Sequence, residues 1–304
     1  MATYNGEKYL PQQLQSLIDQ TYKDFKVIIY DDCSTDSSFD IIKQYAEDYP
    51  DVIFAYQNKI NSTSAKYNFM NMMIGYKDDY IMLCDQDDVW LDDKIEITLE
   101  KMSRMEQKYG KQTPLLTHTD LTVVDDNLNV ISPSFREAMN ADYSKTELRQ
   151  QLIQNTLTGC TCMYNRAVAD LIVDVPDYCV MHDWFLMLVV SAFGKIEALP
   201  NTQTILYRQH KENQVGAKDV RTLKYKINKL LNGKDVRRAI NETYTQAESF
   251  YNIYKNKLSN SQISLLKAYI NIPNLNKFGR WRTIVKLGVL KNGIARKIAN
   301  FIFI

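Results

Sequence analysis

The sequence predicts an α/β protein with a mostly parallel, open sheet, and two observations support this. Short apolar runs at residues 27–30, 52–56 and 80–84 lack polar alternation, as expected of strands that are buried on both faces. Segments with helical spacing of apolar residues separate these runs, for example over residues 7–20 and 65–76. Alternating strands and helices are typical of a mostly parallel sheet with helices on its faces.

The elements can be justified in chain order. Leu10, Leu14 and Leu17 recur at helical spacing and indicate the first helix. The turn at residues 31–36 is rich in helix-capping side chains and introduces the second helix. Up to residue 109 we expect a helix over 7–20, a strand over 27–30, a helix through 41–45, a strand over 52–56, a helix over 65–76, a strand over 80–84 and a helix over 92–109.

The second half of the chain is less regular. Residues 121–124 and 130–131 flank an Asp-Asp-Asn sequence, which predicts a hairpin. From about residue 219 the pattern is helical, with breaks expected at Pro273 and Gly279. Between these regions we expect a strand over 158–164, a helix over 182–193 and a strand over 204–207.

Length and composition fit one α/β domain with an appendage. The chain has 304 residues, of which 45% are hydrophobic and 24% charged, as in folded globular proteins. We expect the domain over residues 1–215 and a helical C-terminal extension over residues 216–304. The net charge of +1 favours no particular partner, and we expect no nucleic-acid partner.

The cysteines and the apolar runs indicate the compartment. The five cysteines are an odd number and no pair has the C-x-x-C spacing, which disfavours disulfide scaffolds and zinc ribbons. Reduced thiols are typical of cytoplasmic proteins. No apolar run is long enough to span a bilayer and no signal-peptide pattern opens the sequence, so we expect a cytoplasmic protein.

Two acidic turns follow buried strands. Residues 31–36 (Asp-Asp-Cys-Ser-Thr-Asp) come after the strand at 27–30, and residues 85–88 (Asp-Gln-Asp-Asp) after the strand at 80–84. Ligands of open parallel sheets bind beyond the carboxyl ends of the strands. A carboxylate of the first turn can accept hydrogen bonds from a nucleobase or a ribose, while helix capping is the alternative role of this turn.

The second turn carries three carboxylates within four residues. Burying such like charges is unfavourable unless a cation compensates them. Mg²⁺ and Mn²⁺ prefer oxygen ligands and commonly bind one or two carboxylates together with phosphate oxygens. Asp85 and Asp87 can both face the crevice when Gln86 points away. A solvated acidic turn is the alternative, but the buried strand before it and the apolar residues 89–91 after it favour a metal site.

Three segments together resemble one protein family. Residues 2–7 (Ala-Thr-Tyr-Asn-Gly-Glu), residues 31–36 and residues 84–90 (Cys-Asp-Gln-Asp-Asp-Val-Trp) resemble family 2 glycosyltransferases of the GT-A fold in order, spacing and position at strand ends. The resemblance covers roughly residues 1–215. Residues 84–90 and 207–210 (Tyr-Arg-Gln-His) most resemble bacterial rhamnosyltransferases that build cell-wall or capsular polysaccharide.

The resemblance implies a donor side with Mn²⁺ or Mg²⁺. Asp87 would bind the metal directly, Asp85 would lie near the ribose and the metal, and Asp88 would be a ligand or a helper behind them. Arg208 and His210 follow an expected strand and either meet the diphosphate, with His210 as an alternative metal ligand, or lie in a surface loop. The residues expected to bind the nucleotide sugar are Thr3, Tyr4, Asp31, Asp32, Lys66, Asp85, Asp87 and Arg208, with Asp32 reading the base.

An acceptor side is implied by later residues. Asp183 matches the general base of the family and opens the helix expected over 182–193, where a plain N-cap is the alternative role. Trp184 beside it is a candidate surface for stacking on a sugar. Gly159 falls where the family places its acceptor-side loop.

The reaction implied by the resemblance is an inverting, metal-dependent single displacement. The acceptor hydroxyl loses its proton to Asp183 and attacks the anomeric carbon from the face opposite the leaving nucleoside diphosphate. The expected donor is dTDP-rhamnose, which supplies L-rhamnose, with a UDP-hexose as the alternative. The expected acceptor is a hydroxyl of a growing polysaccharide, either a free or a lipid-linked glycan.

The sequence also bears on other protein classes, and it departs from the family at its N-terminus. Residues 5–8 (Asn-Gly-Glu-Lys) are not a glycine-rich phosphate loop, which disfavours a nucleotidyltransferase and a dehydrogenase. A non-catalytic sugar-nucleotide-binding protein of the same fold stays an alternative. The family places a strand before residues 3–5, and only Met1 and Ala2 precede them here, so we expect this first strand to be missing at the N-terminus, through a shortened chain or a misplaced start.

The C-terminal extension is basic. No acidic residue follows Glu248, and lysines and arginines are interspersed with an apolar stripe from Trp281 to Phe301. Such a segment can lie in the plane of an anionic membrane or can pack as an amphipathic helix on the catalytic domain. With a lipid-linked acceptor, the first alternative would make this a peripheral protein at the inner face of a bacterial plasma membrane.

Overall fold

The computed structural model describes residues 1–210 and 233–304. The chain forms two compact units whose segments alternate along the sequence. The second unit draws segments from both sides of the boundary expected near residue 215, so the division into domains at that point stays a prediction. The first unit comprises Met1–Phe135, Thr158–Val175 and Glu197–Ala217, and the second comprises Arg136–Leu157, Pro176–Ile196 and Lys218–Ile304.

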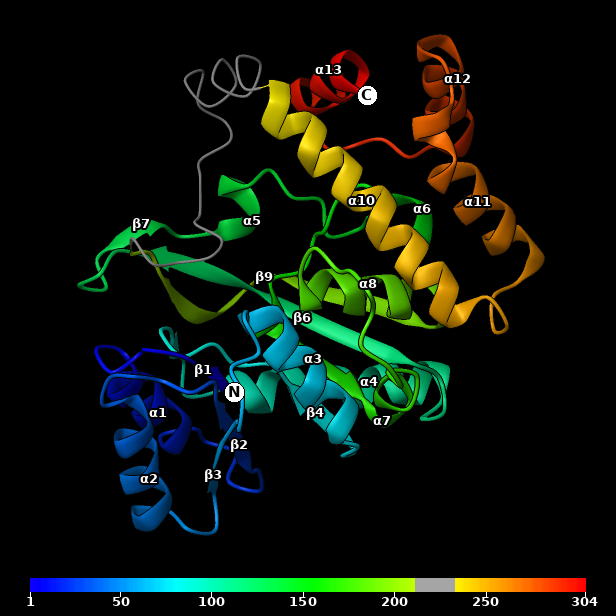
Figure 1. Ribbon diagram of the computed structural model, residues 1–304. Helices are drawn as coiled ribbons and strands as arrows, with labels where there is room; N and C mark the ends of the chain where they lie inside the picture. Colours follow the sequence, from blue (N-terminus) through cyan, green and yellow to red (C-terminus); the bar gives the residue numbers. More distant parts are fainter. Residues whose placement is uncertain (211–232) are drawn as a thin grey trace. The chain divides into compact units, whose positions relative to one another are not determined.

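A parallel sheet of three strands opens the first unit. The strands lie side by side in the order β1-β2-β3, with Thr3 opposite Asp31 and Asp31 opposite Gln57. The helices α1 and α2 pack against each other and lie beside β2 and β3 (Figure 1). The apolar face of α1 is buried with the strands because its leucines recur at helical spacing. The elements are β1 (Ala2–Thr3), α1 (Leu10–Ile18), β2 (Val27–Asp31), α2 (Ser38–Asp48) and β3 (Ile53–Gln57).

A second sheet follows, with its described strands in the order β4-β8-β6-β9-β5 and with β7 paired to β6. The pairs β4–β8, β6–β8, β6–β7 and β5–β9 are antiparallel. The expected α/β architecture is therefore confirmed. The expected parallel pairing holds for β1, β2 and β3, whereas these pairs of the second sheet are antiparallel. These elements are α3 (Ala65–Gly75), β4 (Tyr80–Met82), β5 (Val89–Trp90), α4 (Lys94–Tyr109), β6 (Leu115–Val124), β7 (Val130–Ser132), η1 (Gly159–Thr161), β8 (Cys162–Asn165), α7 (Arg166–Ala169) and β9 (Lys195–Arg208).

The second unit is helical. Its core includes an aromatic cluster in which the ring centroids of Phe185 and Phe250 lie 6.0 Å apart and those of Phe250 and Tyr254 lie 4.8 Å apart. These contacts join α8 to α10. The remaining elements, of which α5 begins at the last residue of the first unit, are α5 (Phe135–Ala138), α6 (Leu148–Gln151), α8 (His182–Phe193), α10 (Gly233–Tyr254), α11 (Asn260–Ile270), η2 (Ile272–Asn274), α12 (Lys277–Leu287) and α13 (Ile294–Phe303).

Several expected elements need correction and others hold. The hairpin is confirmed by the pairing of β6 with β7, and the helix over 182–193 coincides with α8. In place of a strand over 158–164, the chain forms the 3₁₀ helix η1 and then the short strand β8, and β9 is longer than the expected 204–207. The break at Gly279 is wrong, because the Asn276 side chain caps α12 by accepting the Gly279 N–H at 2.8 Å. Residues 219–232 of the expected helical pattern lie outside the described residues.

None of the helices in the described residues is long and apolar enough to cross a membrane.

Candidate active site

The first acidic turn follows β2, and protein donors surround its Asp31 carboxylate. Asp31 is fully buried and accepts hydrogen bonds from Thr3 Oγ1 at 3.2 Å, Ser34 N at 2.9 Å and Gln57 Nε2 at 3.0 Å. The Ser34 hydroxyl donates to the same carboxylate. Thr3 is also buried, so this network joins all three parallel strands at their carboxyl ends.

Asp32 holds the loop that follows β3. Its carboxylate accepts hydrogen bonds from Asn58 Nδ2 at 2.8 Å and from the N–H and hydroxyl of Ser62, each at 2.7 Å. Ser62 therefore ties this loop to the first acidic turn. Lys66 is the second residue of α3, and its Nζ lies 5.0 Å from the centroid of the Tyr67 ring. Base reading by Asp32 and a nucleotide contact of Lys66 stay predictions.

Gln86 connects the second acidic turn to the segment after β1. The Tyr4 N–H donates to Gln86 Oε1 at 2.8 Å, and Gln86 Nε2 donates to the Tyr4 carbonyl at 3.1 Å. A Cβ atom at Gly6 would lie 2.6 Å from Gln86 Cδ, so glycine leaves room for this contact. Gln86 thus points away from the carboxylates, as expected, while the Tyr4 ring stays exposed.

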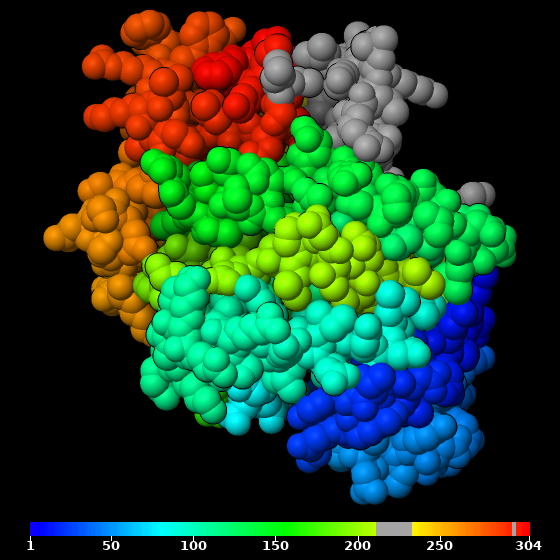
Figure 2. Space-filling model, turned by 180° about the vertical axis from the view of Figure 1, so that it is seen from behind, coloured from blue at the N-terminus to red at the C-terminus, as the bar shows by residue number. Residues whose placement is uncertain are grey.

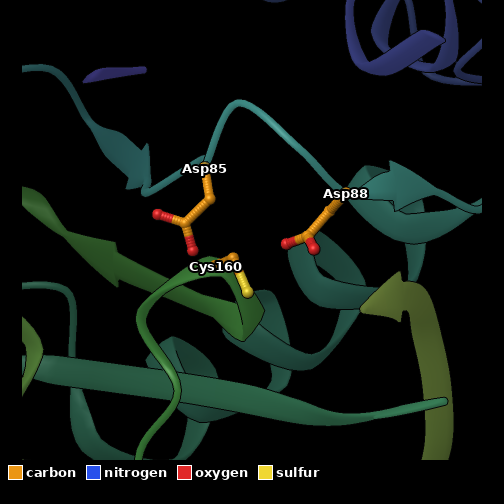
Figure 3. A group of neighbouring side chains, drawn as sticks. All are labelled: Asp85, Asp88 and Cys160. Atoms are coloured by element: carbon orange, nitrogen blue, oxygen red, sulfur yellow. The ribbon is translucent and has the colours of Figure 1, made fainter. Parts of the chain in front are cut away.

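Three side chains converge beneath the second turn. A carboxylate oxygen of Asp85, a carboxylate oxygen of Asp88 and the Cys160 sulfur lie within 4.8 Å of one another. Figure 3 shows the two carboxylates reaching from the turn toward the space above Cys160. Asp88 is fully buried, and its Oδ1 accepts the Arg208 N–H at 3.2 Å. Its Oδ2 has no hydrogen-bond partner within the described part of the chain.

The electrostatics of this cluster disfavour two ionised carboxylates side by side. Burial raises the pKa of Asp88 well above its usual value, and the neighbouring carboxylates of Asp87 and Asp85 raise it further, while the Arg208 N–H and the Cys160 thiol oppose this rise. Burial and then the carboxylates of Asp88 and Asp85 also raise the pKa of the Cys160 thiol. Cys160 therefore stays a neutral thiol beside the carboxylates and adds no charge to them.

The cluster fits a hard divalent cation. Two carboxylates converge, and one buried carboxylate oxygen lacks a protein donor, which a cation would satisfy. The neutral thiol of Cys160 is a poor ligand for Mg²⁺ or Mn²⁺, which prefer oxygen. The residues present are thus suited to Mg²⁺ or Mn²⁺ better than to a soft metal that binds thiolate.

Asp87 lies with His210 rather than in the carboxylate group. Asp87 Oδ2 is 2.8 Å from His210 Nε2. The His210 ring lies against the Tyr9 ring, with centroids 4.6 Å apart. The structure therefore brings together two of the expected metal ligands, Asp87 and His210, and separately brings Asp85 to Asp88. Their roles as ligands stay predictions.

Arg208 anchors the end of β9 to the second turn. Its buried guanidinium donates to the Asp87 carbonyl at 2.9 Å, to the Asp126 carbonyl at 2.6 Å and to Gln12 Oε1 at 2.5 Å. The same group lies 4.9 Å from the centroid of the Tyr9 ring. Through these contacts Arg208 stabilises the second acidic turn. Its contact with a diphosphate stays a prediction.

A buried lysine lies in the core of the same unit. Lys94, at the start of α4, is fully buried, and its Nζ lies 4.5 Å from the centroid of the Trp90 ring. Within residues 1–210 and 233–304 this Nζ has no hydrogen-bond partner. Burial lowers the pKa of Lys94 to about 8, while the nearby thiols and the Asp88 carboxylate oppose this shift.

The expected acceptor-side residues lie in both units. Gly159 belongs to the first unit, where it begins η1 directly before Cys160. Asp183 and Trp184 belong to the second unit and lie in the first turn of α8. Asp183 is buried and accepts the Trp184 N–H at 2.6 Å, whereas Trp184 Nε1 donates to the Gln151 carbonyl at 2.6 Å.

Sequence reasoning missed four residues of this region. Tyr9 lies between Arg208 and His210, and its only signal in the sequence was the helical pattern around it. Gln86 was considered only as a residue that points away from the crevice, not as a link to Tyr4. Cys160 follows Gly159 directly, but its spacing from the acidic turn is not visible in the chain. Lys94 could have been noticed, because it occupies the buried face of α4 with Ile95, Thr98 and Met102.

Comparisons with known proteins identify the family of this chain. The family model described as glycosyl transferase family 2 matches residues 1–171. A curated relative, the dTDP-rhamnosyl transferase RfbG of Shigella flexneri, is 29% identical over 255 residues, which cover 79% of this chain and 82% of the relative. The family model covers more than half of the chain and includes both acidic turns.

Solved structures show the same fold at low sequence identity. S. aureus TarS in complex with UDP matches with a TM-score of 0.54 at 15% identity, covering 91% of this chain and 71% of that chain. The mannosyltransferase PcManGT from Pyrobaculum calidifontis, in complex with GDP-Man and Mn²⁺, matches with a TM-score of 0.51 at 11% identity, covering 95% of this chain and 84% of that chain. These neighbours have the GT-A fold, and the chain described here belongs to glycosyl transferase family 2.

Proposed function

We propose that this glycosyltransferase moves L-rhamnose from dTDP-rhamnose to a hydroxyl of a growing, lipid-linked polysaccharide, with inversion at the anomeric carbon. The observation that carries a metal-dependent transfer is the convergence of Asp85 and Asp88, with one carboxylate oxygen that lacks a protein donor. The choice of dTDP-rhamnose is supported by the name of the Shigella relative.

On the donor side, Asp85 and Asp88 would hold Mn²⁺ or Mg²⁺. Asp87 in the same turn and His210, two residues after β9, are the further candidate ligands. The cation would supply positive charge to the leaving diphosphate. Arg208 and Gln86 keep the turn in place. The exposed ring of Tyr4 is available to the nucleobase, while Thr3, Asp31 and Asp32 fix the strand ends behind it and Lys66 adds a positive charge near the nucleotide.

On the acceptor side, Asp183 accepts the proton of the attacking hydroxyl. The acceptor oxygen forms a bond to the anomeric carbon while the bond from that carbon to the diphosphate breaks, and the electron pair leaves with the diphosphate. Attack from the opposite face inverts the configuration. Trp184 offers a face for an acceptor sugar, and Gly159 belongs to the acceptor-side loop.

The test is nucleoside diphosphate release from a panel of dTDP-, UDP- and GDP-sugars with Mn²⁺, with and without chelator, using the wild-type chain and Asp183→Asn. Release from dTDP-rhamnose that chelator and Asp183→Asn each abolish supports the proposal. Release only from a UDP-hexose would replace the donor. Binding of nucleotide sugar without release from any donor would favour a non-catalytic protein of the same fold.

Inversion is tested separately on the product. The anomeric configuration of the transferred sugar, measured by NMR coupling constants, should be opposite to that of the donor. A product with retained configuration would refute the single displacement and with it the role of Asp183 as the only base.

A further inference from the structure

The exposed face of α12 carries large apolar side chains. Phe278 is 72% exposed, Val285 is 60% exposed, and Trp281 lies between them and is also exposed. Their spacing of three and then four residues places them on one side of the helix. Ile284, by contrast, is buried against the rest of the second unit. This apolar stripe is therefore not the packing face of α12.

The neighbouring helix α13 continues the apolar surface. Ile298 and Ile302 are exposed and lie one helical turn apart. Trp281 Nε1 donates to the Phe301 carbonyl at 2.7 Å, which joins the two helices. Of the eleven exposed large apolar side chains in the described residues, five lie on these two helices. The clustering distinguishes them from isolated exposed residues, which are common on any protein.

Cations surround the apolar stripe. Lys277, Arg282 and Lys286 on α12 and Lys297 on α13 are exposed, and Lys277 Nζ lies 5.4 Å from the centroid of the Trp281 ring. No acidic residue occurs after Glu248. Figure 2 shows side chains of the orange-to-red C-terminal helices projecting from the surface. We name the exposed side chains of α12 and α13 the C-terminal basic face; they are Lys277, Phe278, Trp281, Arg282, Val285, Lys286, Lys297, Ile298 and Ile302.

We propose that the C-terminal basic face binds an anionic phospholipid bilayer, with α12 and α13 lying in the plane of its surface. The helices have 11 and 10 residues, too few to cross a bilayer but enough to bury one apolar side. Apolar side chains enter the lipid boundary, Trp281 occupies the interface, and the cations meet lipid phosphates. A protein partner of matching shape would need acidic residues opposite several cations, whereas anionic lipid headgroups supply that charge everywhere.

Bilayer binding does not depend on the glycosyl transfer proposed above, whereas its use to reach a lipid-linked acceptor does rest on that reaction. Binding is therefore measured without any sugar nucleotide. The probe is a set of vesicles made of phosphatidylglycerol and phosphatidylcholine in equal parts, compared with vesicles of phosphatidylcholine alone. The full chain is floated with the vesicles, and the bound fraction is measured.

The test variant is Phe278→Glu with Val285→Glu, which replaces two exposed apolar groups by acids and leaves the buried Ile284 in place. The matched control is Val130→Glu with Ile131→Glu, because these residues are similarly exposed, at 63% and 61%, but lie on β7 in the first unit. Circular dichroism verifies that both variants fold like the wild type.

The expected result is flotation of the wild type and of the control with phosphatidylglycerol vesicles, weakened by salt, and at least about a tenfold loss of affinity in the test variant. Three results would overturn the proposal: no flotation of the wild type, equal flotation of the test variant, or a salt-independent preference for neutral vesicles. A wild type that is dimeric without vesicles, together with a monomeric test variant, would instead assign this face to a second copy of the chain.

Discussion

The two acidic turns of the first unit occupy the same place in the fold, since each follows the carboxyl end of a strand, but their surroundings differ. Asp31 and Asp32 together receive hydrogen bonds from side chains and backbone of Thr3, Ser34, Gln57, Asn58 and Ser62. Asp88 receives one backbone N–H, and one of its oxygens has no partner within the described residues.

This difference distinguishes a turn whose carboxylates stabilise the fold from a turn whose carboxylates are suited to binding a ligand. A buried carboxylate with several donors is stable without any ligand, because the donors replace the water that the charge has lost. A buried carboxylate beside two further carboxylates keeps an elevated pKa until a cation neutralises the group. The first turn is thus satisfied by protein donors as folded, whereas the second leaves a buried carboxylate oxygen that the proposed cation would contact.

The largest expected effect comes from Asp88→Asn. We expect kcat to fall by about 10²–10³-fold, because the cation loses a ligand opposite the leaving diphosphate. Without metal, the same change should leave stability unchanged or raise it by about 1 kcal/mol, because it removes a charge that burial disfavours. Turnover and urea unfolding, each with Mn²⁺ and with chelator, measure both effects. A metal-free variant clearly less stable than wild type would show that the Asp88 charge is already compensated by the protein.

Lys94→Met should give the next largest effect. The folded-state pKa of Lys94 is lowered to about 8 from 10.5, so below pH 8 the folded protein holds a charged amine that the unfolded chain accommodates more easily. Between pH 8 and pH 10.5 the unfolded state binds more protons at Lys94 than the folded state does. The free energy of unfolding of the wild type should therefore rise with pH over this range. Removing the amine should raise stability at neutral pH by about 2–3 kcal/mol and flatten this slope.

The measurement is the urea midpoint of wild type and Lys94→Met from neutral to alkaline pH. Lys101→Met, on the same helix but part of an ion pair with Glu197, is the matched control and should keep the alkaline slope. A slope that persists in Lys94→Met would mean that another group causes it.

Asp31→Asn should behave in the opposite way to Asp88→Asn. An amide places an NH₂ group against donors that now meet a carboxylate, so we expect a loss of about 2–3 kcal/mol in the free energy of unfolding, with or without Mn²⁺. Urea unfolding of the two Asn variants side by side measures this contrast. Equal stability changes in both would remove the distinction between the two turns.

The sequence allowed the prediction of the strand-end position of both turns, because apolar runs and capping residues are local patterns. For Gln86 it supported only a condition, namely that Asp85 and Asp87 can both face the crevice when Gln86 points away, and the structure groups Asp85 with Asp88 instead. It could not show that Ser62 and Asn58 satisfy Asp32, because these partners come from a loop some 30 residues away. For the same reason Cys160 and Tyr9 were not recognised: long-range packing decides which side chains meet, and no single-sequence pattern records it.

The smallest expected effect tests the link between the two turns. Gln86→Ala removes both hydrogen bonds to the Tyr4 backbone, which follows β1 beside Asp31. These contacts are exposed, so we expect a loss of only about 1 kcal/mol in stability. If the link positions Tyr4 for the nucleobase, KM for the donor should rise about three- to tenfold while kcat changes little, since uniform binding is lost and the cation site is untouched. Gly6→Ala, which crowds the Gln86 side chain, should reproduce the KM effect. A fall in kcat with unchanged KM would instead mean that Gln86 holds the carboxylates of the second turn, and the two turns would then work as one element.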